Sequence, residues 1–298
     1  MTHANSRRVS SYQVVDVFTQ RRLEGNPLAV FPDGAGLDDA TMQSIARELR
    51  LPETVFVVKT TRADCAARLR IFTPMREIPF AGHPTVGTSF VLLENGSLGP
   101  DTEEFGLEER IGRVSVRVER GNEPLIWLKT PPIEDGPLFD RAVCAKALGM
   151  PDADLLDCQP QLLSAGNPTI FIALRDKQAV DRAWLDASGM AMLGKMDSTP
   201  PCIFVFAPTA EGAYSRMFAP AHGIAEDPAT GSATGPLAAY MMRHHLAPTA
   251  DGSRFISEQG TKMQRRSILY LQIHGERGVD GIEVGGYVTP LVRAEMQL

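Results

Sequence analysis

The sequence predicts an α+β protein made of two pseudo-symmetric halves, each a mostly antiparallel sheet wrapped around one central helix. Short motifs of the first half return in the same order in the second half, and many short β-rich runs alternate with turn residues. Each half also contains one strongly apolar helix, expected over residues 82–94 and about 232–244. A helix with such wide apolar coverage is typical of one enclosed by sheet.

Three pairs of segments carry the repeat. Arg70-Ile71-Phe72-Thr73-Pro74 returns as Arg216-Met217-Phe218-Ala219-Pro220, residues 25–30 return as 166–171, and residues 55–57 return as 203–205. A single short match can arise by chance, but three in one order at nearly one spacing indicate two similar halves. The last pair aligns Glu53 with Pro201, so only the first half would carry a carboxylate at this position.

The chain of 298 residues exceeds the usual size of a single core, so we expect two domains. The first is expected over residues 1–130, with a C-terminal strand at about 284–298 returning to it. The second is expected over residues 131–283, after a proline-containing linker at 130–133.

Composition excludes several classes of function. A net charge of −6 without long charged runs argues against nucleic acid and anionic membranes as partners. No segment approaches the roughly 20 apolar residues that span a bilayer. Residues 1–11 are polar and are expected to be a disordered lead-in rather than a signal peptide. Four cysteines without CxxC spacing and six scattered histidines predict a cytoplasmic protein with reduced thiols and no metal site.

Periodicity and turn residues place the individual elements. Asp38 is a plausible N-cap for a helix over 39–49, and Glu53 lies where the chain enters the next strand. Further helices are expected over 139–148 and 184–193. Strands are expected over residues 12–18, 28–31, 54–59, 68–72, 113–119, 125–129, 162–163, 169–174, 202–207, 214–218, 268–274 and 282–288.

Two glycine-bearing loops open the apolar helices, at residues 81–87 and 226–235. The first backbone N–H groups of a helix lack intrahelical partners, and together with the helix dipole they attract anions. Asp227 lies just outside the first turn of its helix, where it could also act only as an N-cap. If the halves pack face to face, two such helix starts oppose one another across a cleft, which suits a small carboxylate ligand.

These motifs resemble the PhzF (phenazine biosynthesis) family over nearly the whole chain, from about residue 12 to the C-terminal strands. The resemblance implies the diaminopimelate-epimerase-like fold, which agrees with the internal repeat. It is carried by Gly25-Asn26-Pro27, Pro52-Glu53-Thr54, Phe72-Thr73-Pro74, Phe80-Ala81-Gly82-His83-Pro84-Thr85, Phe218-Ala219-Pro220, residues 226–233 and Ser257-Glu258-Gln259-Gly260.

The resemblance implies an isomerase of a small cyclic carboxylic acid that transfers a proton between carbons without a cofactor. In the phenazine-pathway member the substrate is trans-2,3-dihydro-3-hydroxyanthranilate, and a homodimer is the family expectation. Carried over to this sequence, Glu53 becomes the acid/base, with His83 and Asp227 as its polar partners. Backbone donors to the substrate carboxylate would come from Gly82, Gly231 and Ser232.

Other interpretations remain for the same residues. Glu53 could be a surface glutamate and His83 a helix cap, while Asn26 and Thr73 fit loop-shaping roles. The cysteine epimerases of this fold carry one cysteine at each helix start, where this chain has Ala81 and Asp227, so a thiol epimerase is not expected. A non-catalytic protein that binds a metabolite or a partner in the cleft is the alternative function.

One stretch departs from the family pattern. Where the family commonly shows Met-Gly-Arg-Pro-Ser, this chain reads Met263-Gln264-Arg265-Arg266-Ser267. Gln264 and Arg266 replace a glycine and a proline, which is expected to alter a loop or an interface.

Overall fold

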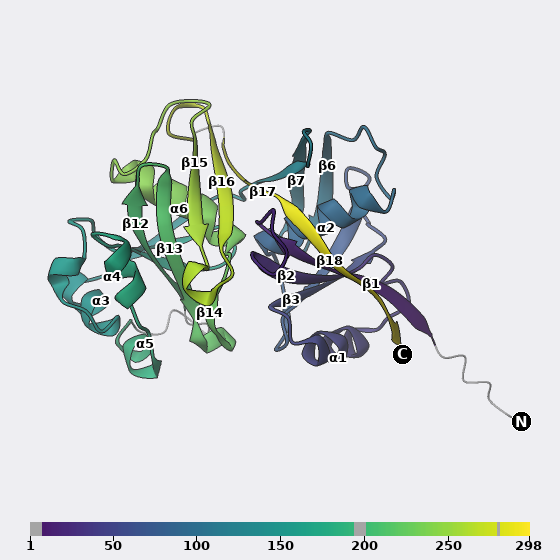
Figure 1. Cartoon of the computed structure of the whole chain (residues 1–298), viewed down its shortest axis with the longest axis horizontal. Helices are drawn as coiled ribbons and strands as arrows, with labels where there is room; N and C mark the ends of the chain where they lie inside the picture. The colour runs from purple at the N-terminus through teal and green to yellow at the C-terminus, as the bar shows by residue number, and fades with distance from the viewer. Residues whose placement is uncertain (1–7, 194–200, 279–280) are drawn as a thin grey trace, which may run out of the picture.

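Two lobes lie side by side, and each encloses one helix in strands (Figure 1). The computed structural model describes residues 8–193, 201–278 and 281–298. The enclosed helices are α2 (Gly82–Glu94) in the first lobe and α6 (Gly231–Arg243) in the second. The predicted fold class, a sheet wrapped around one central helix in each half, is confirmed.

The first lobe is built from the N-terminal part of the chain and its last strand. Helix α1 (Asp39–Leu49) packs outside its sheet, with Met42 and Ile45 against Phe31 and Phe56. Its strands are β1 (Val9–Val17), β2 (Asn26–Phe31), β3 (Glu53–Val58), β4 (Ala67–Phe72), β5 (Glu77–Ile78), β6 (Glu104–Glu109), β7 (Gly112–Glu119), β8 (Leu125–Lys129) and β18 (Val288–Gln297).

The second lobe repeats this plan with three short helices on its outer side (Figure 1). These are α3 (Arg141–Ala147), α4 (Lys177–Arg182) and α5 (Ala187–Leu193). Its strands are β9 (Glu134–Leu138), β10 (Gln161–Ser164), β11 (Thr169–Ala173), β12 (Cys202–Thr209), β13 (Gly212–Ala219), β14 (Ile224–Asp227), β15 (Arg254–Gln259), β16 (Ser267–His274) and β17 (Gly281–Gly286).

The strand pairings of the two lobes correspond one to one. Most are antiparallel, but β2–β3 and β4–β6 are parallel in the first lobe, as are β11–β12 and β13–β15 in the second. Each lobe also ends by sending a strand to the other. After β8 the chain crosses to form β9 beside β10, and after β17 it crosses back to form β18 beside β1. At the crossing, β8 and β17 pair with one another.

Most of the predicted elements are found where the sequence placed them, with the α1 boundaries and its Asp38 cap confirmed. The prediction missed β5, β6, β9, β14, β15 and α4, which are short or rich in charged residues and therefore show little apolar periodicity. The lead-in was predicted too long, since residues 9–11 belong to β1, while residues 1–7 lie outside the described ranges. The domain boundary at residue 130 stays a prediction.

No helix among the described residues is long and apolar enough to cross a membrane.

Candidate active site

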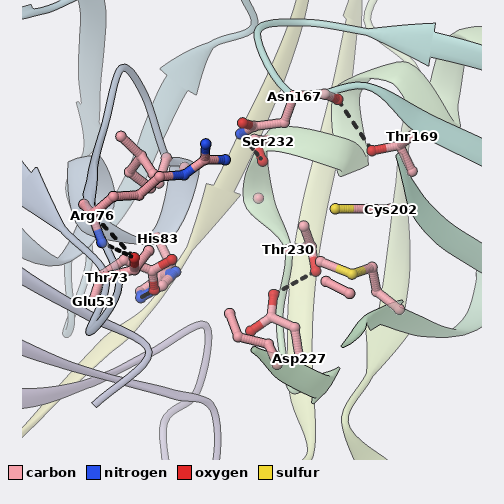
Figure 2. A pocket seen from close by; sticks show the side chains of 17 residues that line it. Glu53, Thr73, Arg76, His83, Asn167, Thr169, Cys202, Asp227, Thr230 and Ser232 are labelled. Atoms are coloured by element: carbon pink, nitrogen blue, oxygen red, sulfur yellow. Dashed lines mark hydrogen bonds and ion pairs between the residues drawn. The ribbon is translucent and has the colours of Figure 1, made fainter. Parts of the chain in front are cut away.

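The predicted site residues line one cleft between the lobes. Figure 2 shows Glu53, Thr73, Arg76 and His83 on one side of this cleft. The facing side carries Asn167, Thr169, Cys202, Asp227, Thr230 and Ser232. Gly82 and Gly231 also line it, so the structure brings together all six residues that the sequence singled out. Within the described ranges, no group of three or more His, Cys, Asp or Glu side chains could hold a metal ion.

The two central helices meet at their N-termini beside this cleft. A Cβ atom added to Gly82 would lie 2.6 Å from the carbonyl carbon of Gly231 and 2.8 Å from the nitrogen of Ser232. Glycine is therefore required here by the close approach of two backbones. Because the N-terminus of a helix carries partial positive charge, the cleft contains two converging positive ends. This arrangement favours an anionic ligand.

Glu53 and His83 face one another on the first-lobe side of the cleft. The Nε2 atom of His83 lies 3.1 Å from Oε2 of Glu53, and both side chains are almost fully buried. The angle is not that of a hydrogen bond, and among the described residues neither atom has an aligned partner. Such contacts are often poorly aligned before substrate binds. Glu53 is thus not the surface glutamate of the alternative interpretation.

Asp227 lies at the end of β14, buried opposite Glu53. Burial, and next the charge of Glu53, raise the pKa of Asp227 to about 7, while His83 and hydrogen bonds from Thr230 and Asn26 oppose the rise. A carboxyl group in this environment is protonated in a substantial fraction of molecules at neutral pH. Asp227 is therefore suited to donate a hydrogen bond or a proton, whereas a simple N-cap would be ionised.

Two residues outside the predicted set hold Asp227 in place. The hydroxyl of Thr230 donates to Oδ2 of Asp227 at 2.6 Å. The side-chain amide of Gln259 donates to the backbone oxygen of Asp227 at 2.7 Å and to the Thr230 hydroxyl at 3.0 Å. Gln259 lies within a motif that carried the family resemblance, and this was the available signal for its role.

The second-lobe counterpart of Glu53 is Cys202, which corrects the sequence alignment with Pro201. In the parallel pairs, Leu28 lies opposite Glu53, and Thr169 lies opposite Cys202. Leu28 and Thr169 both follow a Gly-Asn-Pro turn, so the structural repeat differs from the sequence repeat by one residue. The conclusion that one half alone carries the carboxylate is unchanged, but a cysteine does line the cleft.

Burial raises the pKa of Cys202 to about 12, and the charge of Asp227 contributes to the rise. Because the thiolate is the reactive form of cysteine, this thiol is unsuited to act as a base or nucleophile.

We expect Cys202→Ser to keep turnover within about threefold of wild type. A side chain that takes no part in proton transfer supplies none of the roughly 10²–10⁴-fold that a general acid or base contributes. The measurement is steady-state kinetics, with iodoacetamide labelling of the wild type at pH 7.5 as a second readout. Rapid labelling of Cys202, or a 100-fold loss in the serine variant, would contradict this assignment.

A further buried carboxyl group, that of Glu109, lies beneath the start of α2. The hydroxyl of Thr85 donates to its Oε1 at 2.6 Å. Burial raises the pKa of Glu109 to about 8, although hydrogen bonds from Thr85 and from the N–H of Ala81 oppose this. The neighbouring Glu108 shows the reverse, because hydrogen bonds from Thr60 and Thr61 lower its pKa to about 2.

Glu109→Gln is expected to make the protein more stable than wild type at pH 9. At pH 5 the free energy of unfolding should stay close to that of the wild type. Between pH 4.5 and about 8 the folded protein keeps a proton on Glu109 that the unfolded chain loses, so stability falls as pH rises. One pKa unit corresponds to about 1.4 kcal/mol, so the gain at pH 9 amounts to a few kcal/mol. Urea unfolding at both pH values measures it.

The matched control is Glu108→Gln, on the same strand. Its carboxylate stabilises the fold above the ordinary glutamate pKa, and this contribution is lost as pH falls toward 2. The control should therefore be destabilised at both pH values. Loss of stability at pH 9 in the Glu109 variant would show that burial does not raise the pKa of Glu109.

The stretch that departs from the family pattern contacts the first lobe. Gln264 adopts the left-handed conformation (φ 57°), and Arg266 pairs with Glu258 at 3.0 Å. Arg265 reaches across to the buried Asp16 at 2.6 Å and to the backbone oxygen of Gly25 at 2.8 Å. The stretch thus fixes the turn at Gly25 without lining the cleft.

Comparison with known proteins gives results that agree with this geometry. The sequence pattern of the PhzC-PhzF family, described as phenazine biosynthesis-like protein, matches residues 15–292. A trans-2,3-dihydro-3-hydroxyanthranilate isomerase of Pseudomonas aeruginosa is 35% identical over 279 residues, which cover 92% of this chain and 95% of that protein.

Solved structures show the same fold. A phenazine biosynthesis protein of the PhzF family from Bacillus anthracis superimposes with a TM-score of 0.86 at 23% identity, covering 98% of this chain and 100% of that one. A hydroxyproline epimerase from Agrobacterium vitis, with bound trans-4-hydroxy-L-proline, gives a TM-score of 0.66 at 12% identity, covering 98% and 93%. Both likenesses concern the fold alone.

Proposed function

Because this chain is an isomerase of the phenazine biosynthesis-like PhzF family, we propose that it moves a proton between two carbons of a small cyclic carboxylic acid, with Glu53 as the acid/base. We further propose that the substrate is trans-2,3-dihydro-3-hydroxyanthranilate in a phenazine pathway, and that the protein acts as a homodimer. The observation that carries the proposal is the meeting of two helix N-termini beside three buried, titratable side chains.

The substrate carboxylate would lie against the N-terminal ends of α2 and α6. The backbone N–H groups of Gly82, Gly231 and Ser232 belong to the first turns, where no intrahelical acceptor is available. Arg76 extends toward this part of the cleft (Figure 2) and adds a positive charge. Fixed donors on the carboxylate would also stabilise the enolate-like charge that develops when a neighbouring C–H bond is broken.

Glu53 would take a proton from one carbon and deliver a proton to another, and while the proton is on its carboxyl group it can exchange with solvent. The electron pair of the broken C–H bond enters the conjugated system, the double bonds shift, and a new C–H bond forms at the second carbon. No net proton is gained or lost, so a single base suffices. The second-lobe counterpart of this residue is a protonated thiol, which supports a one-base reaction.

The experiment is an NMR assay in D₂O with trans-2,3-dihydro-3-hydroxyanthranilate. Conversion to an isomer, with deuterium appearing at a carbon of the product, is the expected result. Lack of turnover with this compound, but turnover of another cyclic carboxylate, would reject the named substrate and keep the reaction class. Sedimentation velocity on the same sample tests the homodimer.

The alternative is a non-catalytic protein that binds a metabolite in the same cleft. Such a protein would bind small carboxylates, seen as protection from thermal unfolding, without exchanging any C–H proton. Binding without exchange across a panel of cyclic carboxylates would favour this alternative. The burial of Glu53, His83 and Asp227 together favours the enzyme, because a binding protein gains nothing from burying three titratable side chains.

A further inference from the structure

Asn26, at the start of β2, contacts two of the three residues proposed for proton transfer. Its side chain is fully buried, and its Nδ2 atom lies 2.9 Å from Oδ1 of Asp227 and 3.3 Å from Nδ1 of His83. The same nitrogen lies 2.9 Å from the backbone oxygen of Ala229 in the second lobe. Its sequence motif predicted only a turn-shaping role.

The backbone oxygen of Ala229 decides which end of the amide faces this corner. A carbonyl oxygen can only accept hydrogen bonds, so it requires the NH₂ group of Asn26. Rotating the amide by half a turn would place its oxygen against the oxygens of Ala229 and Asp227. Among the described residues, the amide oxygen itself has no hydrogen-bond partner, so Asn26 acts here through its NH₂ group.

The orientation of Asn26 fixes the protonation of His83. A nitrogen that faces an NH₂ donor must offer a lone pair, so Nδ1 of His83 carries no proton. The proton of the neutral imidazole is then on Nε2, which lies 3.1 Å from Oε2 of Glu53. A doubly protonated ring would set an N–H group against the amide hydrogens. The two amide hydrogens serve three acceptors, which accounts for the longer contact to His83.

We propose that Asn26 is a positioning residue that holds His83 in the tautomer protonated on Nε2. This rests on the proposed function, in which Glu53 is the base. Once the two side chains align, an imidazole protonated on Nε2 would donate a hydrogen bond to the Glu53 carboxylate without giving it the proton. After C–H cleavage, the proton remains on Glu53 for delivery to the substrate, because the His83 nitrogen that faces Glu53, Nε2, already carries a proton.

The turn that carries Asn26 is held by close contacts on both sides. Gly25 has φ 68°, and a Cβ atom there would lie 2.3 Å from the backbone oxygen of Val17. Arg265 of the second lobe donates to the oxygens of Gly25 and Glu24, both at 2.8 Å. A side chain fixed on both sides in this way can set the geometry of its neighbours.

The second lobe provides a matched control, because Asn167 occupies the equivalent turn. Its Nδ2 atom lies 3.3 Å from the backbone oxygen of Phe80 in the first lobe and 3.2 Å from the hydroxyl of Ser232. Asn26 and Asn167 therefore join the lobes in the same way, but only Asn26 contacts a histidine. Asn167→Asp separates the effect on His83 from the effect on lobe contact.

The test is ¹⁵N NMR of the imidazole groups in the free protein, with the His83 signals assigned from His83→Gln. In a titration of the wild type from pH 6 to 8, we expect the neutral ring to carry its proton on Nε2 and none on Nδ1. Asn26→Asp replaces the donor with an acceptor and should move the proton to Nδ1 or produce the imidazolium. Asn167→Asp should leave the His83 signals unchanged. Glu53, Asp227, Arg76 and Cys202 share the cleft, so each variant is titrated over the whole range.

Kinetics supply the second readout. Asn26→Asp is expected to lower kcat by roughly 10²–10⁴-fold, the contribution of one acid–base partner, with a smaller change in KM. Asn26→Ala, which introduces no charge, serves if the aspartate variant does not fold, and should show both tautomers. A wild-type His83 protonated on Nδ1, or a wild-type tautomer retained in both variants, would overturn the proposal. Because the spectra need no substrate, this failure is distinct from failure of the proposed function.

Discussion

Glu53→Gln is expected to lower kcat by roughly 10²–10⁴-fold while KM changes by no more than a few fold. The amide has the shape of the carboxyl group but cannot take a proton from carbon. Binding of the substrate carboxylate depends on the helix N-termini and is largely retained. Stopped-assay kinetics and the rate of deuterium incorporation should fall together, since both require the same C–H cleavage.

The same variant has a second expected effect, on Asp227. The charge of Glu53 is one of the causes that raise the pKa of Asp227 to about 7, so its removal should lower that pKa. A ¹³C NMR titration of the Asp227 carboxyl group measures this in the absence of substrate. The exposed Glu103→Gln is the control and should change neither property. Full activity of Glu53→Gln would show that the base is another residue.

Gly82→Ala is expected to reduce kcat/KM by at least about 100-fold and to destabilise the protein by about 1–3 kcal/mol. The added methyl group would stand 2.6 Å from the Gly231 backbone, which cannot rotate away as a side chain can. The helix starts must therefore separate. That separation moves the backbone donors away from the substrate carboxylate and Asp227 away from Glu53.

Gly99→Ala is the matched control for this change. It is a glycine without positive φ, and its nearest neighbour would be the Thr102 hydroxyl at 3.5 Å, an ordinary contact. The control should keep full activity and wild-type stability. Crystal structures of both variants would show whether the helix starts have moved apart. A Gly82→Ala protein with wild-type kinetics would exclude a substrate carboxylate at this junction.

The fold was predictable from the sequence because its signals are local and repeated. Asp38 and the apolar pattern after it defined α1, and the Gly-Asn-Pro turns marked the entry to β2 and β11. The family motifs located Glu53, His83 and Asp227, which the structure brings to one cleft. Their catalytic roles stay predictions.

The features that could not be predicted from the sequence depend on strand register and on contacts between residues far apart in the chain. The correspondence of Cys202 with Glu53 follows from strand pairing, and the alignment of the two sequence halves missed it by one residue. The charged residues of β6 did not resemble a strand in the sequence. The structure accommodates them through contacts that the sequence does not show, because Thr85 bonds the buried Glu109 and two threonines bond Glu108. Asn26 contacts His83 and Asp227, which lie 57 and 201 positions further along the sequence. No local sequence pattern can predict contacts over such separations.

The reciprocal crossing of β9 and β18 has a consequence for the origin of the asymmetric cleft. Two separate copies of a half-length chain, each lending its last strand to the other, would form the same architecture as a two-fold symmetric pair. Joining the copies end to end preserves the architecture, and the two sides of the cleft can then carry different residues. A glutamate on one side and a cysteine on the other, like a histidine opposite a serine, are differences that two identical chains related by symmetry could not have.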